Sequence, residues 1–574
     1  MTRKQLQNFL LVTLVGGMIA LIVSFLFPSE AKSQQVWIYS YTRLAVVIGI
    51  VILLTILLVL LLNTIRDKAV SRRLLGWIRT QMASENLSVK LWIIQILTCL
   101  FLVELFLLLF IADPPFLRSF FAWFFVVVTA AWVTLRLSYP ASFSERRVLF
   151  NQLKNSWRGL LPVQRKTFYV IAILGLVYFL AFIPLNLLPE DSQTMSPFSG
   201  IDEVIQYRAV TEILVPGENF SSTVTKILLH KTVYWEHPFF LISASTLLLP
   251  RILFNTDFVN HVQLNMLILR QLITVLPFVL SMFLLVWIVL RFKSILKSVS
   301  MFMLLLSIPG VVDLNIRFHR MDSLLVLFII LTFFFLQKDD LHLGFNFYLA
   351  AFACGIAVAV KIWGFFFFLP ILVYLFTSLA RKRGDFGKHI RAGIGFVVVM
   401  FMALFLSSPG LMIPQVLKDE VAIIFSEQNN RILENSQTDP EGVYVKGYSN
   451  WMRYFEMSFM REHYFWFCFI VLGLSSLSGS EKLLGRLLLA WCFSTALFLI
   501  YFVAIKSPWY MLPLMVPLYG SPFLLPAALK ISPTSRLYNI FSHPVARFVV
   551  WGAIVGFCGV QFVFNMIQVI GYTQ

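Results

Sequence analysis

Apolar runs about as long as a bilayer is thick recur along almost the whole chain. A helix needs roughly 20 mostly apolar residues to cross the hydrocarbon core of a membrane. The composition agrees, because 59% of the residues are hydrophobic, 13% are charged and the mean hydropathy is +0.83. We therefore predict an all-α, multi-pass integral membrane protein with about fifteen transmembrane helices.

The predicted spans form two groups. Residues 1–166 make an N-terminal extension with four spans and basic connections, and residues 167–574 make a core with two sizeable outer loops, 189–266 and 408–462. The spans of the extension are residues 9–27, 45–62, 91–110 and 119–137. The spans of the core are residues 168–188, 272–290, 299–312, 323–336, 345–360, 363–379, 392–406, 464–477, 487–503, 509–529 and 548–570.

Lysine and arginine crowd three connections that lie on one side of these spans, at residues 66–90, 146–166 and 381–391. The positive-inside rule places such connections in the cytoplasm, together with the N-terminus. The net charge of +18 is then a topology signal and no sign of nucleic-acid binding. We expect the plasma (inner) membrane of a prokaryote, with the polar segments between the other span ends outside the cytoplasm.

Residues 239–254 are apolar enough for a span, but counting them would reverse the orientation of every later loop. The basic connection at 381–391 would then lie outside, against the positive-inside rule. We predict that residues 239–254 lie in the interface or re-enter the membrane.

Asp202 and Glu203 stand side by side in a polar segment between two spans. Carboxylates in so apolar a chain cost free energy unless they face water, a partner or a substrate. Residues 201–214 carry apolar side chains at helical spacing, which predicts a short amphipathic helix on the membrane with Asp202 near its N-terminus. The pattern indicates an active site at the outer membrane surface.

Further motifs share that outer side. They are Asp202-Glu203 with Tyr207-Arg208, Trp235-Glu236-His237-Pro238, Asn315-Ile316-Arg317 through Arg320 to Asp322, Lys361-Ile362-Trp363, and Lys506-Ser507-Pro508-Trp509-Tyr510. In this order they resemble the GT-C superfamily of integral-membrane glycosyltransferases over roughly residues 167–530. The closest branch is that of protein O-mannosyltransferases and lipid A aminoarabinose transferases. Phe239 departs from the pattern, since it stands where a second proline is usual.

The resemblance implies a GT-C-like core with extracytoplasmic juxtamembrane helices. It also implies transfer of a hexosyl or pentosyl group from a polyprenyl-phosphate-linked donor to a lipid, glycan or protein acceptor outside the cytoplasm. The expected partners are this donor, that acceptor and the bilayer, without nucleic acid. Asp202 would be the general base for the acceptor hydroxyl. Glu203 would orient Asp202 or, if a divalent cation is used, share its coordination, so metal dependence stays open.

The leaving group in such a reaction is a lipid phosphate, whose developing charge needs fixed cations. Four side chains are expected to supply them: Arg317, Arg320, Lys361 and Lys506. The other expected substrate-binding residues are Tyr207, Arg208, His237, Asp322 and Tyr510.

Each residue also has a plainer interpretation. Acidic residues stabilise any helix N-terminus, arginines snorkel, and lysines anchor spans. The main alternative function is a multi-span transporter or lipid flippase with a charged gate on its outer face. A structural or assembly role for the N-terminal spans is a third. The clustering of charge at one surface, without an inverted repeat, favours the glycosyltransferase.

Overall fold

The structure is a computed structural model that describes the core of the chain and little of the N-terminal extension. The described residues are 35–36, 39–40, 159–187, 198, 201–215, 217, 222–223, 226–227, 236–316, 319–381, 385–412, 447–477, 481–503, 508–528 and 544–573. The four spans predicted between residues 9 and 137 lie outside them.

The chain divides into two compact units. The first comprises Met1–Gly159, Glu212–Leu229 and Pro250–Phe258, and the second comprises Leu160–Thr211, His230–Leu249 and Val259–Gln574. Among the described residues of the first unit, β1 (Gln35–Val36) pairs antiparallel with β2 (Tyr39–Ser40). Most of the described helices belong to the second unit. The predicted division at residue 166 stays a prediction.

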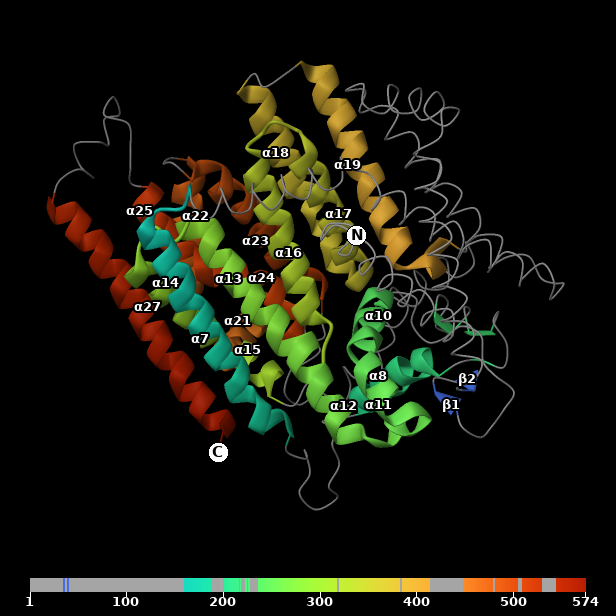
Figure 1. The fold of residues 1–574 in the computed structure, drawn as a ribbon. Coiled ribbons are helices and arrows are strands. Elements are labelled where there is room, and N and C mark those ends of the chain that lie inside the picture. The colour runs from blue at the N-terminus through green and yellow to red at the C-terminus, as the bar shows by residue number, and fades with distance from the viewer. Residues whose placement is uncertain are drawn as a thin grey trace, which may run out of the picture. The chain divides into compact units, whose positions relative to one another are not determined.

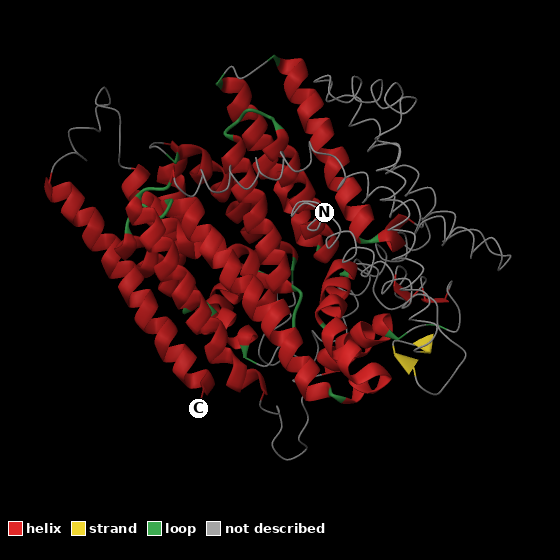
Figure 2. Ribbon diagram, in the orientation of Figure 1, coloured by secondary structure: helices red, strands yellow, loops and turns green. Residues whose placement is uncertain are grey.

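The described part is helical apart from these two short strands, which confirms the predicted all-α class (Figure 2). The helices up to the middle of the chain are α7 (Pro162–Leu187), α8 (Ile201–Leu214), α10 (His237–Thr246), α11 (Leu248–Phe254), η1 (Asn255–Asn260), α12 (Val262–Leu269), η2 (Arg270–Val275), α13 (Leu276–Leu290), α14 (Ile295–Leu306) and α15 (Pro309–Asn315). The later ones are α16 (Asp322–Asp339), α17 (Phe345–Val360), η3 (Ile362–Phe367), α18 (Phe368–Ala380), α19 (Phe386–Ser407), η4 (Pro409–Met412), α21 (Tyr448–Ser458), α22 (Glu462–Leu477), α23 (Lys482–Phe502), α24 (Pro508–Gly520), η5 (Ser521–Leu524), α25 (Leu525–Ala528) and α27 (Pro544–Thr573).

Within the described residues, six helical segments are long and apolar enough to cross a membrane. The pair α14 and α15 would be a seventh, bent by 63°. The remaining spans predicted in the core also form helices, but each departs from a simple span. Helix α16 carries Asp322, Lys338 and Asp339 at its ends. Helices α17 and α22 have only 16 residues each. Helix α24 is followed directly by the 3₁₀ turn η5.

Residues 201–214 and 239–254, which the sequence places at the membrane surface, both form short helices, and their position at a membrane stays a prediction. Residues 201–214 are helix α8, with the bounds expected from the apolar spacing. Residues 239–254 are divided between α10 and α11, which break at Leu247. At 1.5 Å per residue, the 10-residue α10 measures only about 15 Å, half the thickness of a hydrocarbon core. It is therefore too short for a span. Figure 1 shows α8, α10 and α12 at the end of the second unit that also holds the C-terminus of α27.

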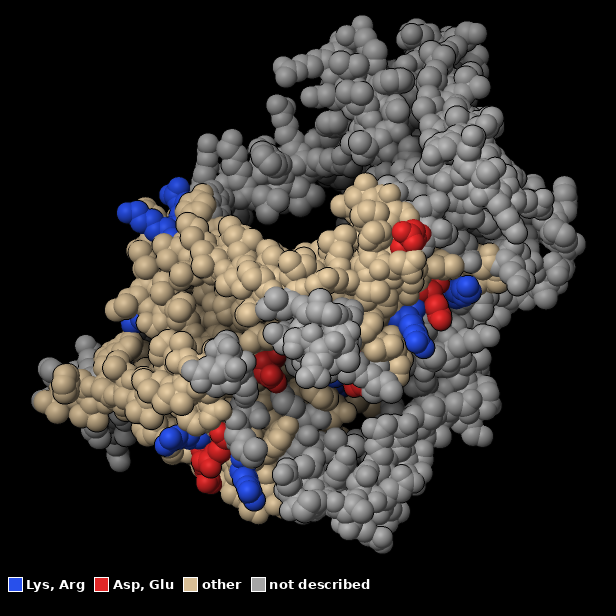
Figure 3. Space-filling view, turned by 90° about the horizontal axis from the view of Figure 1, so that it is seen from below, with Lys and Arg blue, Asp and Glu red and all other residues tan. Residues whose placement is uncertain are grey.

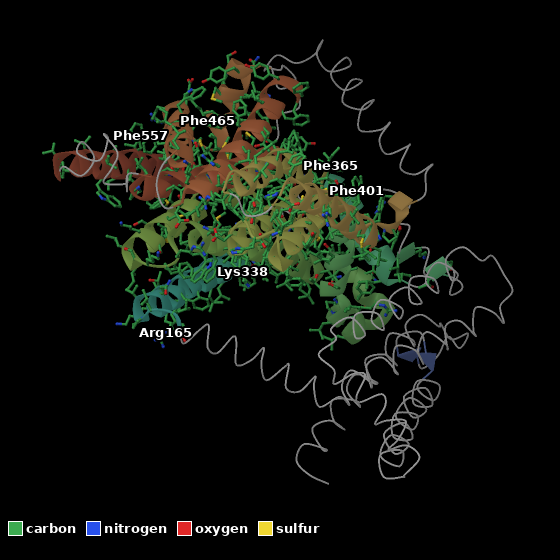
Figure 4. The ribbon with its side chains drawn as sticks, turned by 90° about the horizontal axis from the view of Figure 1, so that it is seen from above. Arg165, Lys338, Phe365, Phe401, Phe465 and Phe557 are labelled. Carbon is green, nitrogen blue, oxygen red and sulfur yellow. The ribbon has the colours of Figure 1, made fainter. Side chains whose placement is uncertain are left out.

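The core of the second unit is built from α13, α16, α17 and α23. Trp491 of α23 packs in a three-ring cluster, with centroids 4.5 Å from Phe367 and 6.1 Å from Phe333, which are 5.0 Å apart. A close helix contact forms where α17 passes α19, because a Cβ at Gly355 would lie 2.2 Å from the carbonyl oxygen of Met400. Farther along the same contact, Phe365 and Phe401 approach to 6.3 Å (Figure 4). This packing fixes α17, whose C-terminal end carries Lys361.

Helices α12, η2 and α13 form one continuous rod with a π-helical middle. Pro277 explains the break in register, because proline has no N–H to donate to the carbonyl of Ile273 four residues earlier. π-helical turns of this kind are rare and often lie at functional sites. Here the π-helical turn faces the connection between α15 and α16.

Candidate active site

Helix ends of the second unit bring most of the predicted site residues to one end of the bundle. Asp202 lies in the first turn of α8, Arg320 in the connection before α16, and Asp322 at the first position of α16. Lys361 joins α17 to η3, and Tyr510 lies near the start of α24. Figure 3 views the molecule from this end and shows acidic and basic side chains next to one another in several small, separate groups.

Asp202 and Arg320 form an ion pair. The distance from Arg320 Nη1 to Asp202 Oδ2 is 3.0 Å, and 57% of the Asp202 side chain is exposed against 12% of Arg320. The guanidinium also lies over the ring of Trp509, 4.4 Å from its centroid. A cation held by an aromatic face and a carboxylate keeps a fixed direction. The pair thus combines an open carboxylate with a sheltered cation.

Asp322 and Lys361 form a second, more buried pair of the same kind. Lys361 Nζ lies 2.7 Å from Asp322 Oδ1 and 4.5 Å from the ring centroid of Tyr510. Burial lowers the pKa of Lys361, but the charge of Asp322 and the contact with Tyr510 outweigh it, so the pKa lies above its ordinary value. Lys361 is therefore a charged ammonium at neutral pH.

Trp509 and Tyr510 join the two pairs. They are consecutive residues in the first turn of α24, and their ring centroids are 6.3 Å apart in an edge-to-face arrangement. Because each ring carries one cation, Arg320 and Lys361 are held over neighbouring rings. The arrangement offers two fixed positive charges next to one exposed carboxylate.

Glu203 points away from this surface and is buried, with 1% of its side chain exposed. Arg270 of η2 binds it through two hydrogen bonds, Nε to Oε1 at 3.0 Å and Nη2 to Oε2 at 2.6 Å. The backbone N–H of His319 donates a third, 2.7 Å long, to Oε1. Both oxygens of Glu203 are thus engaged inside the fold and turned away from the open surface.

Arg270 was missed by sequence reasoning. The signal was present, since a lone arginine interrupts the apolar run before residue 272, and charges inside spans are usually paired. Trp509 was quoted in a motif, but its contact with Arg320 was not foreseen.

Among the other predicted residues, His237 and Tyr207 have their polar atoms engaged inside the fold. His237 Nδ1 donates to the carbonyl of Ser407 at 2.8 Å. The Tyr207 hydroxyl donates to the carbonyl of Val259 at 2.8 Å and accepts from Asn265 at 2.9 Å, and burial raises the pKa of Tyr207. Arg208 is exposed on α8. The predicted Arg317 and Lys506 lie outside the described residues.

The start of α10 is fastened to the same region. The N–H of Glu236 donates to the carbonyl of Ala359, two residues before Lys361, at 2.9 Å. Glu236 has a φ of 75°, which a side chain other than glycine rarely adopts. Strained residues persist only where the surrounding contacts hold them, and they are found most often at functional sites.

His319 packs behind the ion pairs as a neutral imidazole. Burial, followed by the charges of Arg270 and Arg320, lowers the pKa of His319 to about 3. Its Nε2 lies 3.1 Å from the hydroxyl of Ser243, and its ring stacks on Phe239 with centroids 4.6 Å apart. Phe239, which departs from the expected motif, therefore packs against the connection between α15 and α16, through the ring of His319 next to Arg320.

Fold and site together define a polytopic helical membrane protein with an acid–base cluster at one end of its bundle. These are the features that the resemblance to the GT-C superfamily of membrane glycosyltransferases predicts. Residues 230–412 match the model of the dolichyl-phosphate-mannose-protein mannosyltransferase family, which belongs to that superfamily. The matched segment contains His237, Arg320, Asp322 and Lys361, and Asp202 precedes it. No curated protein matches the chain.

Proposed function

We propose that this protein transfers a sugar from a polyprenyl-phosphate-linked donor to an acceptor hydroxyl outside the cytoplasm, with Asp202 as the general base. The matched family is named for dolichyl-phosphate mannose, so a mannosyl polyprenyl phosphate is the first donor to test. The observation that carries the proposal is the exposed carboxylate of Asp202, 3.0 Å from a cation that is itself held by Trp509.

The reaction follows from these groups. The acceptor oxygen attacks the anomeric carbon, its proton passes to Asp202, and the bond from that carbon to the phosphate oxygen breaks. The polyprenyl phosphate leaves with the electron pair. Arg320 and Lys361 stabilise the negative charge that develops on it, and fixed cations cost no reorganisation at that moment.

Arg320 can contact both the base, Asp202, and the leaving polyprenyl phosphate. A guanidinium has five N–H donors in a planar fork, and Asp202 engages Nη1. The same group can therefore bind a phosphate oxygen while it still orients Asp202. Lys361 offers a compact charge on the other side of the aromatic pair.

One displacement inverts the configuration at the anomeric carbon. A second carboxylate that attacks this carbon would be needed for retention. Glu203 and Asp322 are buried in ion pairs with Arg270 and Lys361, so neither can take that role without breaking its pair. We therefore expect an inverted product. The extracytoplasmic side of the reaction rests on the positions of the basic connections in the sequence. A prokaryotic plasma membrane is part of the same proposal.

The test uses the purified full-length protein in lipid nanodiscs with labelled mannosyl polyprenyl phosphate and a panel of lipid, glycan and peptide acceptors. Asp202→Asn should lower the transfer rate by about 10²-fold or more. A matched control is Asp340→Asn, at the other end of α16, since the exposed Asp340 has a φ of 45° that asparagine tolerates. Transfer that is unchanged in Asp202→Asn would exclude Asp202 as the base.

A further inference from the structure

The main chain of Arg320 lies outside any helix, so helical hydrogen bonds do not hold it. Two buried hydroxyls do so instead. Its N–H donates to Thr274 Oγ1 at 3.2 Å, and its carbonyl oxygen lies 3.0 Å from Ser323 Oγ. Thr274 and Ser323 are both completely buried. Arg320 is thus held on both sides of its Cα atom.

The contact with Ser323 depends on the irregular helix α12–η2–α13. Pro277 leaves the carbonyl of Ile273 without the N–H that would bind it in a regular α-helix. Ser323 Oγ lies 2.5 Å from that carbonyl oxygen and 3.0 Å from the carbonyl oxygen of Arg320, so its single O–H is shared between the two in a three-centre hydrogen bond. A buried carbonyl without a partner is costly, so this bond anchors the start of α16 on the π-helical turn. Thr274, the next residue of the same turn, is thereby set opposite the N–H of Arg320.

Positioning matters for a side chain as long as arginine. Its rotamers cost up to about 2 kcal/mol of conformational entropy to order. At its tip, Arg320 is ordered by Asp202 and Trp509. At the Cα end of the side chain, a fixed main chain is needed to place the guanidinium over the ring of Trp509. The hydroxyls of Thr274 and Ser323 hold this main chain in place and do not reach the open surface of the site.

We propose that Thr274 and Ser323 are positioning residues that hold Arg320 in the orientation that binds the donor phosphate. The proposal rests on the proposed function, in which Arg320 contacts this phosphate. Thr274 and Ser323 act through Arg320 and do not touch the substrate.

Thr274→Val is the test variant, because valine fills the same volume and removes the acceptor oxygen. Thr274→Ser restores the hydroxyl. Thr332→Val is the matched control: Thr332 is equally buried in α16, and its hydroxyl bonds within its own helix to the carbonyl of Phe328. Thermal unfolding of each full-length variant in nanodiscs reports whether folding is preserved. Ser323→Ala is a second, independent variant.

Initial rates are measured against the concentration of mannosyl polyprenyl phosphate. Thr274→Val and Ser323→Ala should raise the donor KM by about 10-fold, the effect of one lost hydrogen bond, with a smaller change in kcat. Thr274→Ser should lie within about twofold of the parent protein, and so should Thr332→Val. An equal rise in KM for Thr332→Val would overturn the proposal, since general loosening of the core would then explain the effect.

A double-mutant cycle with Arg320→Gln separates positioning from general packing. In the Arg320→Gln protein, Thr274→Val should cause no further loss of binding of a polyprenyl phosphate. Additive losses would contradict the proposal. Amide hydrogen exchange of a peptide containing Arg320 adds a readout independent of transfer: exchange should be faster in Thr274→Val than in Thr332→Val. If the parent transfers no sugar but this difference appears, the proposed function fails while the anchoring of Arg320 stands.

Discussion

Asp202 and Glu203 are neighbours in the chain, yet 57% of the Asp202 side chain is exposed and only 1% of the Glu203 side chain is. Consecutive residues in the first turn of a helix point in different directions, so one carboxylate faces the open surface and the other faces the core. Asp202 meets Arg320, whereas Glu203 meets Arg270. The doublet therefore divides into one carboxylate at the open surface and one carboxylate that is buried in an ion pair.

Glu203→Gln should destabilise the protein strongly. It leaves the Arg270 guanidinium buried without its counter-charge, which costs about 3–5 kcal/mol in comparable buried pairs. Thermal unfolding in nanodiscs should show a lower Tm for Glu203→Gln and little change for the exposed Asp202→Asn. Joint replacement, Glu203→Leu with Arg270→Met, should recover part of the loss because no lone charge remains buried. Equal Tm values for Glu203→Gln and the parent would contradict a structural role for this ion pair.

Lys361→Met should weaken donor binding and also leave Asp322 buried without a cation. The two effects can be separated. Adding Asp322→Asn removes the stranded charge, so the double variant should regain most of its Tm while the donor KM stays at least about 10-fold above the parent value. Steady-state kinetics and thermal unfolding of both variants are the measurements. Recovery of donor KM in the double variant would show that Lys361 serves only to neutralise Asp322.

His319 makes stability depend on pH on the acidic side. Its pKa is lowered to about 3 in the folded protein, while the unfolded chain takes up the proton near the ordinary value of about 6.5. Between these values the unfolded state binds more protons, so stability rises with pH. The contribution is fully present above about pH 6.5 and is lost as the pH falls toward 3.

The measurement is the Tm of the parent and of His319→Phe from pH 7 to pH 4. Phenylalanine keeps a ring that can stack on Phe239 but cannot titrate. The Tm of the parent should fall more steeply with decreasing pH than that of the variant. Parallel curves would show that other groups cause the acid sensitivity.

Gly355→Ala should shift α17 and with it Lys361, which follows the C-terminal end of this helix. The added Cβ would lie 2.2 Å from the carbonyl oxygen of Met400 and 2.7 Å from the Cβ of Ala403, so α17 and α19 must separate. Overpacking of this kind lowers the free energy of unfolding by about 1–3 kcal/mol. We therefore expect a lower Tm than that of the parent, together with slower transfer. Gly473→Ala is the control, since nothing lies within 4 Å of its added Cβ and alanine favours a helix over glycine. A similar loss in both variants would point to helix propensity and away from the helix contact.

Local patterns predicted much of this protein. Apolar length predicted the helices of the core, because a span is specified by its own residues and the thickness of the bilayer. The spacing in residues 201–214 predicted α8 with its bounds. The order of the motifs predicted the superfamily, and the matched segment agrees. The residue types needed for an acid–base site were visible as charges in an apolar chain.

Only the tertiary structure showed which charged side chains form ion pairs. Asp202 and Arg320 are 118 residues apart, and Glu203 and Arg270 are 67 apart. Such pairs depend on how helices cross and on the register that Pro277 imposes in η2, which no local pattern encodes. The sequence by itself determined the helices of the core, the resemblance to the superfamily and the residue types at the site. The tertiary structure decided which carboxylate is open and which is buried, because burial is a property of the packed helices around a residue.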